Sequence, residues 1–244
     1  MWVVAGDVQH QTGQAAPDTL TGKNSVPETA SYPIRARQSG YIQYTDLDYV
    51  LSLANERNLI IRLLCRTGHF VSSGVVWSPW FGLPVGNRRT PIQDVEYAFI
   101  QLDEMAVPAM SPAINNPYTA ITCLDYVRDG LALFHRQGEI SPQFYDQDGQ
   151  LRFVFEPVTF NKLLSTSFDM LRHASCDNVS VLLHMLDVID GISQETKSPE
   201  VRQQLLHQVS LIQAESQAGA LIEQDRQLIR KSSEALQTKL KSAL

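Results

Sequence analysis

Residues 88–129 hold the side chains whose types and spacing come nearest to a binding site. They form two amphipathic segments that meet at a short polar elbow, residues 111–117. Asn116 followed by Pro117 is typical of a helix start, where backbone amides lack intrahelical partners and the helix dipole attracts anions. Arg88 and Arg89 are the nearest basic pair in the sequence. The predicted ligand-binding residues are Arg89, Gln93, Asp94, Ser111, Asn115, Asn116 and Thr119.

This binding hypothesis makes a demand on geometry. A helix of about eighteen residues rises about 27 Å, so a straight first helix would hold Arg89 far from Asn116. Only a kink at Pro108, or a loop that carries Arg88 and Arg89 back over the elbow, would bring them together.

The same region has no spacing typical of a catalytic or metal centre. Ser111 has no G-x-S-x-G context and no histidine near it in the sequence, so a role in a turn is the simpler interpretation. The sequence contains no H-E-x-x-H, no cysteine pair at metal-ligand spacing and no glycine-rich phosphate loop, so we expect neither a metal nor a cofactor.

Carboxylates crowd the two segments and allow two interpretations. They are general acids and bases if they face one cleft, or a solvated face that pairs with Arg88, Arg89 and Arg128. The residues concerned are Asp94, Asp103, Glu104, Asp125 and Asp129.

Composition limits the classes of function. The formal net charge of −6 and the lack of clustered lysine and arginine argue against nucleic-acid binding. The sequence has no run of eighteen apolar residues that would span a bilayer. Cys65, Cys123 and Cys176 stand far apart, which predicts free thiols in a reducing compartment, with Cys123 buried on the apolar side of its helix.

The predicted fold class is α+β. Residues 1–33 are rich in Gly, Pro, Thr, Ser and Gln without periodicity and are typical of a linker or loosely ordered arm. Residues 34–85 alternate short strand patterns with one helix, which predicts a small β-rich, barrel-like module. Residues 86–244 predict a mainly helical domain with one β-hairpin that turns at Asp148–Gly149.

Local signals place several boundaries within these parts. Asp46 is the expected N-cap of the module's helix, and Asn178 and Ser198 precede two later helices. Pro108 predicts a kink or an early end of the first central helix near Met105. The Asn116 side chain is expected to cap the second central helix.

An aromatic cluster in the module leaves two interpretations open. Trp77, Trp80 and Phe81 mark either a groove or packed core.

Three stretches carry a resemblance to a known family: SGYIQYTDLDYVLSLANERNLIIRLLCRTGHFV, RRTPIQDVEYAFIQLDEMAV and SPAINNPYTAITCLD. They are similar to the soluble part of an uncharacterised bacterial family of predicted membrane proteins, domain of unknown function 2254. The resemblance runs from residue 34 to the C-terminal helices and is most specific over residues 90–125. The residues that match the family pattern there are Gln93, Asp94, Gln101, Leu102, Ser111, Pro112, Asn115, Pro117, Thr119, Ala120, Cys123 and Asp125.

The sequence departs from the family pattern at three positions. His69 stands where the family has Asp, Pro108 where an Arg is usual, and Asn116 where an Asp is usual. Each change removes a charge. A family function that depended on an Arg–Asp pair at the elbow would be lost or altered in this chain.

The resemblance also implies a cellular setting. In that family several transmembrane helices precede the soluble domain, so a membrane portion is expected before Met1, with the soluble part in the cytoplasm. The implied partner is the protein's own transmembrane segment or another membrane protein, and a homo-oligomer stays open.

Two functions from different classes follow. The first is a non-catalytic soluble domain that serves assembly, sensing or regulation of the membrane part. The alternative is a small-molecule or anion-binding enzyme with its site at the elbow.

Overall fold

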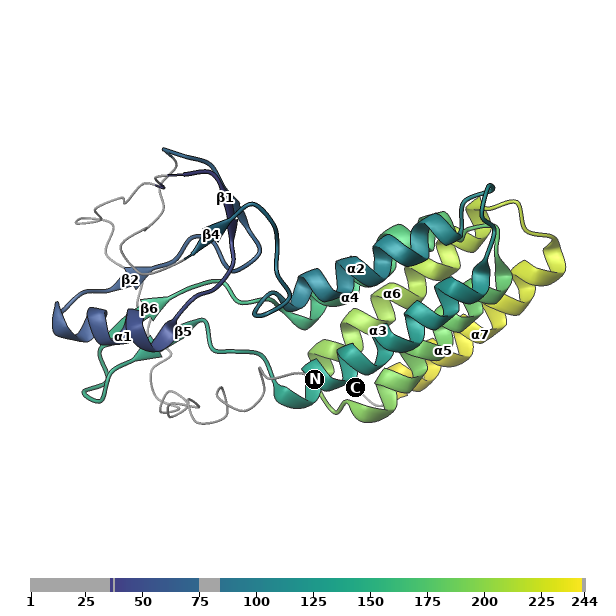
Figure 1. Ribbon diagram of the computed structural model, residues 1–244. Helices are drawn as coiled ribbons and strands as arrows, with labels where there is room; N and C mark the ends of the chain where they lie inside the picture. The colour runs from purple at the N-terminus through teal and green to yellow at the C-terminus, as the bar shows by residue number, and fades with distance from the viewer. Residues whose placement is uncertain (1–35, 37, 75–83, 243–244) are drawn as a thin grey trace. The chain divides into compact units, whose positions relative to one another are not determined.

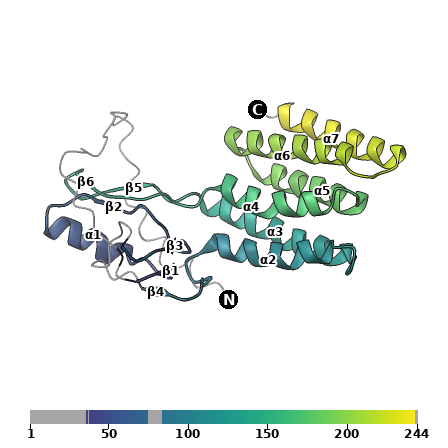
Figure 2. The same ribbon diagram turned by 90° about the horizontal axis from the view of Figure 1, so that it is seen from above.

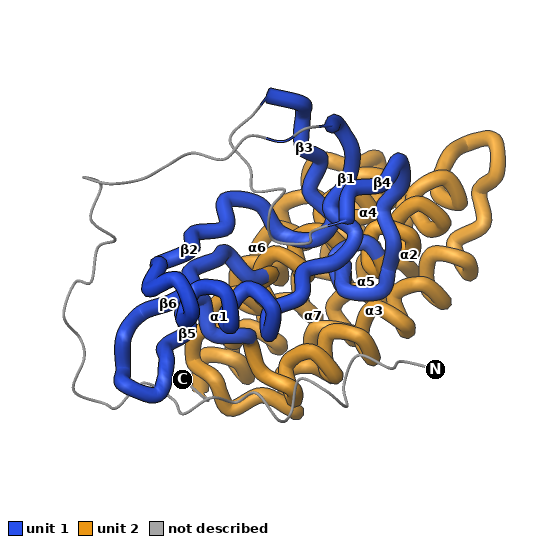
Figure 3. Tube along the Cα trace, turned by 60° about the vertical axis from the view of Figure 1, so that its left-hand side comes forward, with its two compact units in different colours: residues 1–97, 140–157 blue, residues 98–139, 158–244 orange. Residues whose placement is uncertain are grey.

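The computed structural model describes residue 36, residues 38–74 and residues 84–242 (Figure 1). The chain divides into two compact units, shown in different colours in Figure 3. Unit 1 takes in residues 1–97 and 140–157, and unit 2 takes in residues 98–139 and 158–244. The α+β class is confirmed. The predicted arm over residues 1–33 and the aromatic cluster around Trp77 lie outside the described residues.

The first sheet of unit 1 is antiparallel. Strand β1 (Gly40–Ile42) pairs on one side with β3 (Phe70–Val71) and on the other with β4 (Val85–Gly86). Helix α1 (Leu47–Glu56) follows β1 and begins as predicted after Asp46, whose side chain accepts a hydrogen bond from the amide three residues on, at 3.0 Å. A side-chain oxygen in this position satisfies one of the amides that the first turn leaves unpaired.

The second sheet of unit 1 contains the predicted hairpin. Strands β5 (Gln143–Tyr145) and β6 (Leu151–Val154) are antiparallel, and the turn between them includes Gly149 with a φ of 74°. Strand β6 also pairs in parallel with β2 (Ile61–Arg62), which joins the hairpin to unit 1. The unit boundaries therefore differ from the sequence-based division at residue 86, because that parallel pairing joins segments far apart in the chain and leaves no local signal.

Both sheets and α1 contribute to one apolar core in unit 1. Phe144 and Phe155 pack against it from the hairpin and from the residues after it. The buried residues of this core are Ala36, Ile42, Val50, Ala54, Ile61, Leu63, Val71 and Phe153.

Unit 2 is a bundle of helices that lie side by side (Figure 2). Helix α5 packs against α3, α6 and α7, and α4 packs against α3 and α6. Within residues 38–74 and 84–242, the helices lack an apolar window of the length that crossing a membrane requires. The helices of the bundle are α2 (Val95–Ala109), α3 (Pro117–Gln137), α4 (Phe160–Ala174), α5 (Val179–Glu195), α6 (Pro199–Ala218) and α7 (Glu223–Ser242), of which α2 begins in unit 1.

The predicted starts of two helices are confirmed. The Asn178 side chain accepts a hydrogen bond from the Val181 amide at 3.1 Å and caps α5, and the Ser198 side chain caps α6. Of the two alternatives predicted at Pro108, the early end of α2 near Met105 is wrong, because the helix continues to Ala109 with Pro108 in its last turn, and the kink stays a prediction. Near a helix end the missing proline amide removes one hydrogen bond while the preceding turns stay paired.

The predicted side-chain cap of α3 is also wrong. Helix α3 begins at Pro117, but the Asn116 side chain makes no capping hydrogen bond. Instead the Asn116 amide donates to the Ala109 carbonyl at 2.8 Å, which closes the elbow, and the side chain lines a pocket between α2 and α3.

Alanine at position 116 is therefore expected to change the free energy of unfolding by less than about 0.5 kcal/mol. The matched control is Asn178→Ala in the same unit, which removes a formed cap and is expected to cost about 1 kcal/mol. Urea unfolding of the two variants measures the difference. An equal loss in both would mean that Asn116 caps α3 in solution.

Candidate functional site

Charged side chains gather in unit 1 where the chain enters α2. The Asp94 carboxylate, 3% exposed, accepts two hydrogen bonds from the Arg89 guanidinium, Nε to Oδ2 at 2.7 Å and Nη2 to Oδ1 at 2.9 Å. The Tyr97 amide donates to Asp94 Oδ1 at 3.1 Å, so the same carboxylate also caps α2. The Arg89 guanidinium lies over the Tyr97 ring, 5.1 Å from its centroid. Asp94 thus both pairs with Arg89 and caps the first turn of α2.

A second ion pair lies against the first. Arg66 Nη2 donates to Glu96 Oε2, and Arg89 Nη2 lies 3.9 Å from the same oxygen. Arg66, Arg89, Asp94 and Glu96, hereafter the ion cluster, therefore balance two positive charges with two negative ones. For Asp94 the structure shows pairing with arginine, one of the two interpretations that the sequence left open.

Gln93 is held by the backbone beside the ion cluster. Its Oε1 accepts from the Thr45 amide at 2.8 Å, and its Nε2 donates to the Thr45 carbonyl at 3.3 Å. The side-chain amide thus bonds to both backbone groups of Thr45, as a residue of a paired strand would. Arg89, Gln93 and Asp94 all have protein partners. Gln93 fastens the start of α2 to the segment between β1 and α1.

Gly68 lets the chain pass close to the ion cluster. Its φ is +87°, and a Cβ at this position would lie 1.9 Å from Asp94 Oδ2 and 2.8 Å from Arg89 Nη2. Gly74 has a similar φ of +83°, but no heavy atom of the described residues lies within 4 Å of a Cβ built there. A side chain at Gly74 would therefore meet backbone strain alone, whereas a side chain at Gly68 would meet both backbone strain and steric overlap.

We expect Gly74→Ala to cost about 1–2 kcal/mol, the strain of a left-handed backbone conformation. Gly68→Ala should cost at least about 2 kcal/mol more, because the new methyl group displaces Asp94 from Arg89. Thermal unfolding of both variants tests this. Equal losses would show that the Asp94 side chain moves aside without disrupting the cluster.

His69 lies among the same charges. Burial lowers the pKa of His69, and the positive charge of Arg66 lowers it further. The imidazole is therefore held neutral next to the ion cluster. An Asp at this position would bring a third carboxylate to a cluster whose charges already balance.

The elbow residues of the predicted site belong to unit 2. The Ser111 carbonyl accepts hydrogen bonds from the Ile114 and Asn115 amides, at 3.1 Å and 2.8 Å, and Asn115 has a φ of +44°. The predicted set is therefore divided, with Arg89, Gln93 and Asp94 in unit 1 and Ser111, Asn115, Asn116 and Thr119 in unit 2.

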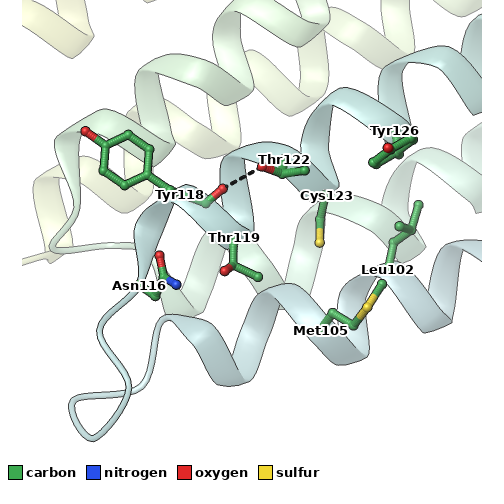
Figure 4. A pocket seen from close by; sticks show the side chains of 8 residues that line it. All are labelled: Leu102, Met105, Asn116, Tyr118, Thr119, Thr122, Cys123 and Tyr126. Atoms are coloured by element: carbon green, nitrogen blue, oxygen red, sulfur yellow. Dashed lines mark hydrogen bonds between the residues drawn. The ribbon is translucent and has the colours of Figure 1, made fainter.

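A pocket of about 430 Å³ lies between α2 and α3 in unit 2 (Figure 4). It brings together two predicted site residues, Asn116 and Thr119. The sequence did not identify the other lining residues as a site, although Tyr118, Thr122 and Tyr126 recur four apart on one face of α3. The complete lining is Leu102, Met105, Asn116, Tyr118, Thr119, Thr122, Cys123 and Tyr126.

Cys123 lies at the pocket wall. All three cysteines are free, and the predicted burial of Cys123 is confirmed. Burial raises the pKa of the Cys123 thiol, and the Asp103 carboxylate raises it further. A thiol in this environment stays protonated at neutral pH and is a poor nucleophile.

Asp103 is a half-buried carboxyl group of α2. Burial, and then the neighbouring charge of Glu104, raises the pKa of Asp103 to about 6. Within the described part of the chain, no group donates a hydrogen bond to its buried Oδ1. The lost hydration of this oxygen is therefore uncompensated.

A family model described as predicted membrane protein (DUF2254) matches residues 4–191. The chain belongs to this family. The resemblance drawn from the sequence is thereby confirmed, and with it the description of the family as predicted membrane proteins.

Similar sequences occur in mycobacteria. The uncharacterized proteins Mb1321c of Mycobacterium bovis and Rv1290c of Mycobacterium tuberculosis are each 24% identical to this chain over 240 residues. The match takes in 88% of this chain and 46% of each relative, so the chain spans about half the length of the curated relatives it matches. No solved structure matches it.

Proposed function

We propose that this DUF2254 chain is the water-exposed part of a longer membrane-anchored protein, and that it serves assembly, sensing or regulation of the membrane part. The observation that carries the proposal is the match to a family of predicted membrane proteins. The match to the similar mycobacterial proteins takes in only 46% of their length. The remaining length of such a protein is sufficient for a membrane portion. In this proposal the partner is that membrane portion or a second copy of the protein, and this part lies in the cytoplasm.

The chemistry of the two units supports an interaction role over catalysis. The guanidinium and carboxylate groups of the ion cluster are occupied with one another, and the Cys123 thiol is held protonated. In this proposal the ion cluster stabilises the fold.

The test uses the M. tuberculosis relative, expressed at full length with a tag inside the part that corresponds to this chain. The full-length protein is expected in the membrane fraction, resistant to alkaline carbonate and released by detergent. In inverted vesicles, protease should remove the tagged part. Recovery of the full-length protein without detergent, or protection of the tag in inverted vesicles together with its cleavage in intact spheroplasts, would contradict the anchoring or the orientation respectively.

The assembly role has its own measurement. In detergent, the oligomeric state of the full-length relative is compared with that of a version that lacks this part. If this part serves assembly, the shortened version should form an oligomer with fewer subunits than the full-length relative. An unchanged oligomer would exclude assembly and leave sensing or regulation.

A second candidate function is small-molecule binding at the elbow. The pocket between α2 and α3 supports it, because the pocket takes in Asn116 and Thr119. This candidate is developed below as binding, without a catalytic step.

A further inference from the structure

The pocket between α2 and α3 has the size of a small-molecule site. Its volume of about 430 Å³ lies within the range of roughly 300–1,000 Å³ that is common for ligand pockets. All of its lining residues lie on two helices of unit 2 or at the start of α3.

One end of the pocket is apolar. Leu102 and Met105 face Tyr126 across the space between the helices (Figure 4). Met105 and Tyr126 are 53% and 63% exposed, so apolar surface here stays in contact with water until something covers it. Methionine and tyrosine adapt well to an apolar ligand, because the thioether is flexible and polarizable and the ring presents a large flat face.

The other end carries hydrogen-bonding groups without partners. The side-chain amide of Asn116 leaves α3 uncapped, and neither this group nor the Thr119 hydroxyl makes a hydrogen bond within the described residues. An asparagine amide offers two donors and an acceptor, and a threonine hydroxyl offers both roles. The Thr122 hydroxyl differs, because it donates to the Tyr118 carbonyl at 2.9 Å.

The lining is electrically neutral. No charged side chain lines the pocket within the part of the chain that the structure describes. The carboxyl group of Asp103, next to Leu102 in α2, already has a pKa of about 6, because its charged form is poorly solvated. A bound anion would meet no countercharge from the lining.

From these observations we infer that the pocket between α2 and α3 binds a small uncharged amphiphile. Its apolar body lies against Leu102, Met105 and Tyr126, and its neutral head, a hydroxyl or an amide, bonds to Asn116 and Thr119. The inference stands on the pocket alone and does not depend on the proposed membrane anchoring.

Methyl-labelled methionine gives a direct test by NMR. The chain has five methionines, of which Met105 lines the pocket and Met170 is exposed outside it. The labelled protein is titrated with 1-octanol and, separately, with octanoate at pH 8. We expect a saturable shift of the Met105 methyl signal with 1-octanol, no shift of Met170, and at least tenfold weaker binding of octanoate.

Two threonine variants complete the test. Thr119→Val removes a free hydroxyl and should weaken 1-octanol binding about three- to tenfold. Thr122→Val makes the same chemical change in the same pocket, but at a hydroxyl that is already bonded, so affinity should stay within about twofold. Absence of a saturable Met105 shift, octanoate binding as tight as 1-octanol, or equal effects of the two variants would each overturn the inference.

Discussion

Replacing Asp94 with alanine is expected to lower the free energy of unfolding of unit 1 by about 3–5 kcal/mol. The substitution leaves the Arg89 guanidinium without its bidentate partner, and the Glu96 carboxylate lies 3.9 Å from it. An arginine that is largely removed from water and has lost its counterion is the costly outcome of breaking such a pair. The substitution also removes the cap of α2, which adds about 1 kcal/mol.

A cap in the same unit provides the matched control. Asp46 caps α1 through a hydrogen bond from one backbone amide, so Asp46→Ala is expected to cost about 1 kcal/mol. Urea unfolding, with hydrogen exchange followed in peptides of unit 1, measures both variants. Equal losses would mean that the ion cluster adds nothing beyond a cap. In a double-mutant cycle, Arg89→Ala should cost much less in the Asp94→Ala background than in the wild type.

Replacing Asp103 with asparagine is expected to stabilise the protein by about 1–2 kcal/mol at pH 7.5. The pKa of this carboxyl group rises from 3.8 to about 6, a rise worth roughly 3 kcal/mol for a fully shielded group. Asp103 is only half-buried, so solvent screening reduces that value. Asparagine has the same shape and never takes the charge.

The sign of the pH dependence follows from the raised pKa. The folded protein holds the proton more tightly than the unfolded chain, so the stabilising contribution is fully present below about pH 4. It is lost as the pH rises through about 6. The advantage of Asp103→Asn should therefore grow between pH 4 and pH 7 and be small at pH 4.

The neighbouring Glu104 provides the control for this second prediction. It is exposed, so Glu104→Gln should change stability by only a few tenths of a kcal/mol at either pH. Urea unfolding of the three proteins at pH 4 and pH 7.5 measures the effect. A pH-independent difference between Asp103→Asn and wild type would show that the pKa of Asp103 is ordinary in solution.

Several local features could be predicted from the sequence because their causes lie within a few residues of chain. Asp46, Asn178 and Ser198 each cap a helix with a hydrogen bond to an amide three residues on. The hairpin turn needs a residue that accepts a positive φ, and Gly149 supplies it next to Asp148. The α+β class follows from the sum of such signals, and the family follows from the stretches that match its pattern.

Only the tertiary structure decided which of these local elements share a unit and a site. The pairing of β6 with β2 moved the hairpin into unit 1, and the Arg66–Glu96 contact joined segments thirty residues apart. The Asn116 side chain lines a pocket and does not cap α3. This pocket exists only because α2 and α3 lie side by side. Strand pairing, ion pairs and pocket walls depend on distances in space, and the chain's local conformational preferences do not encode those distances.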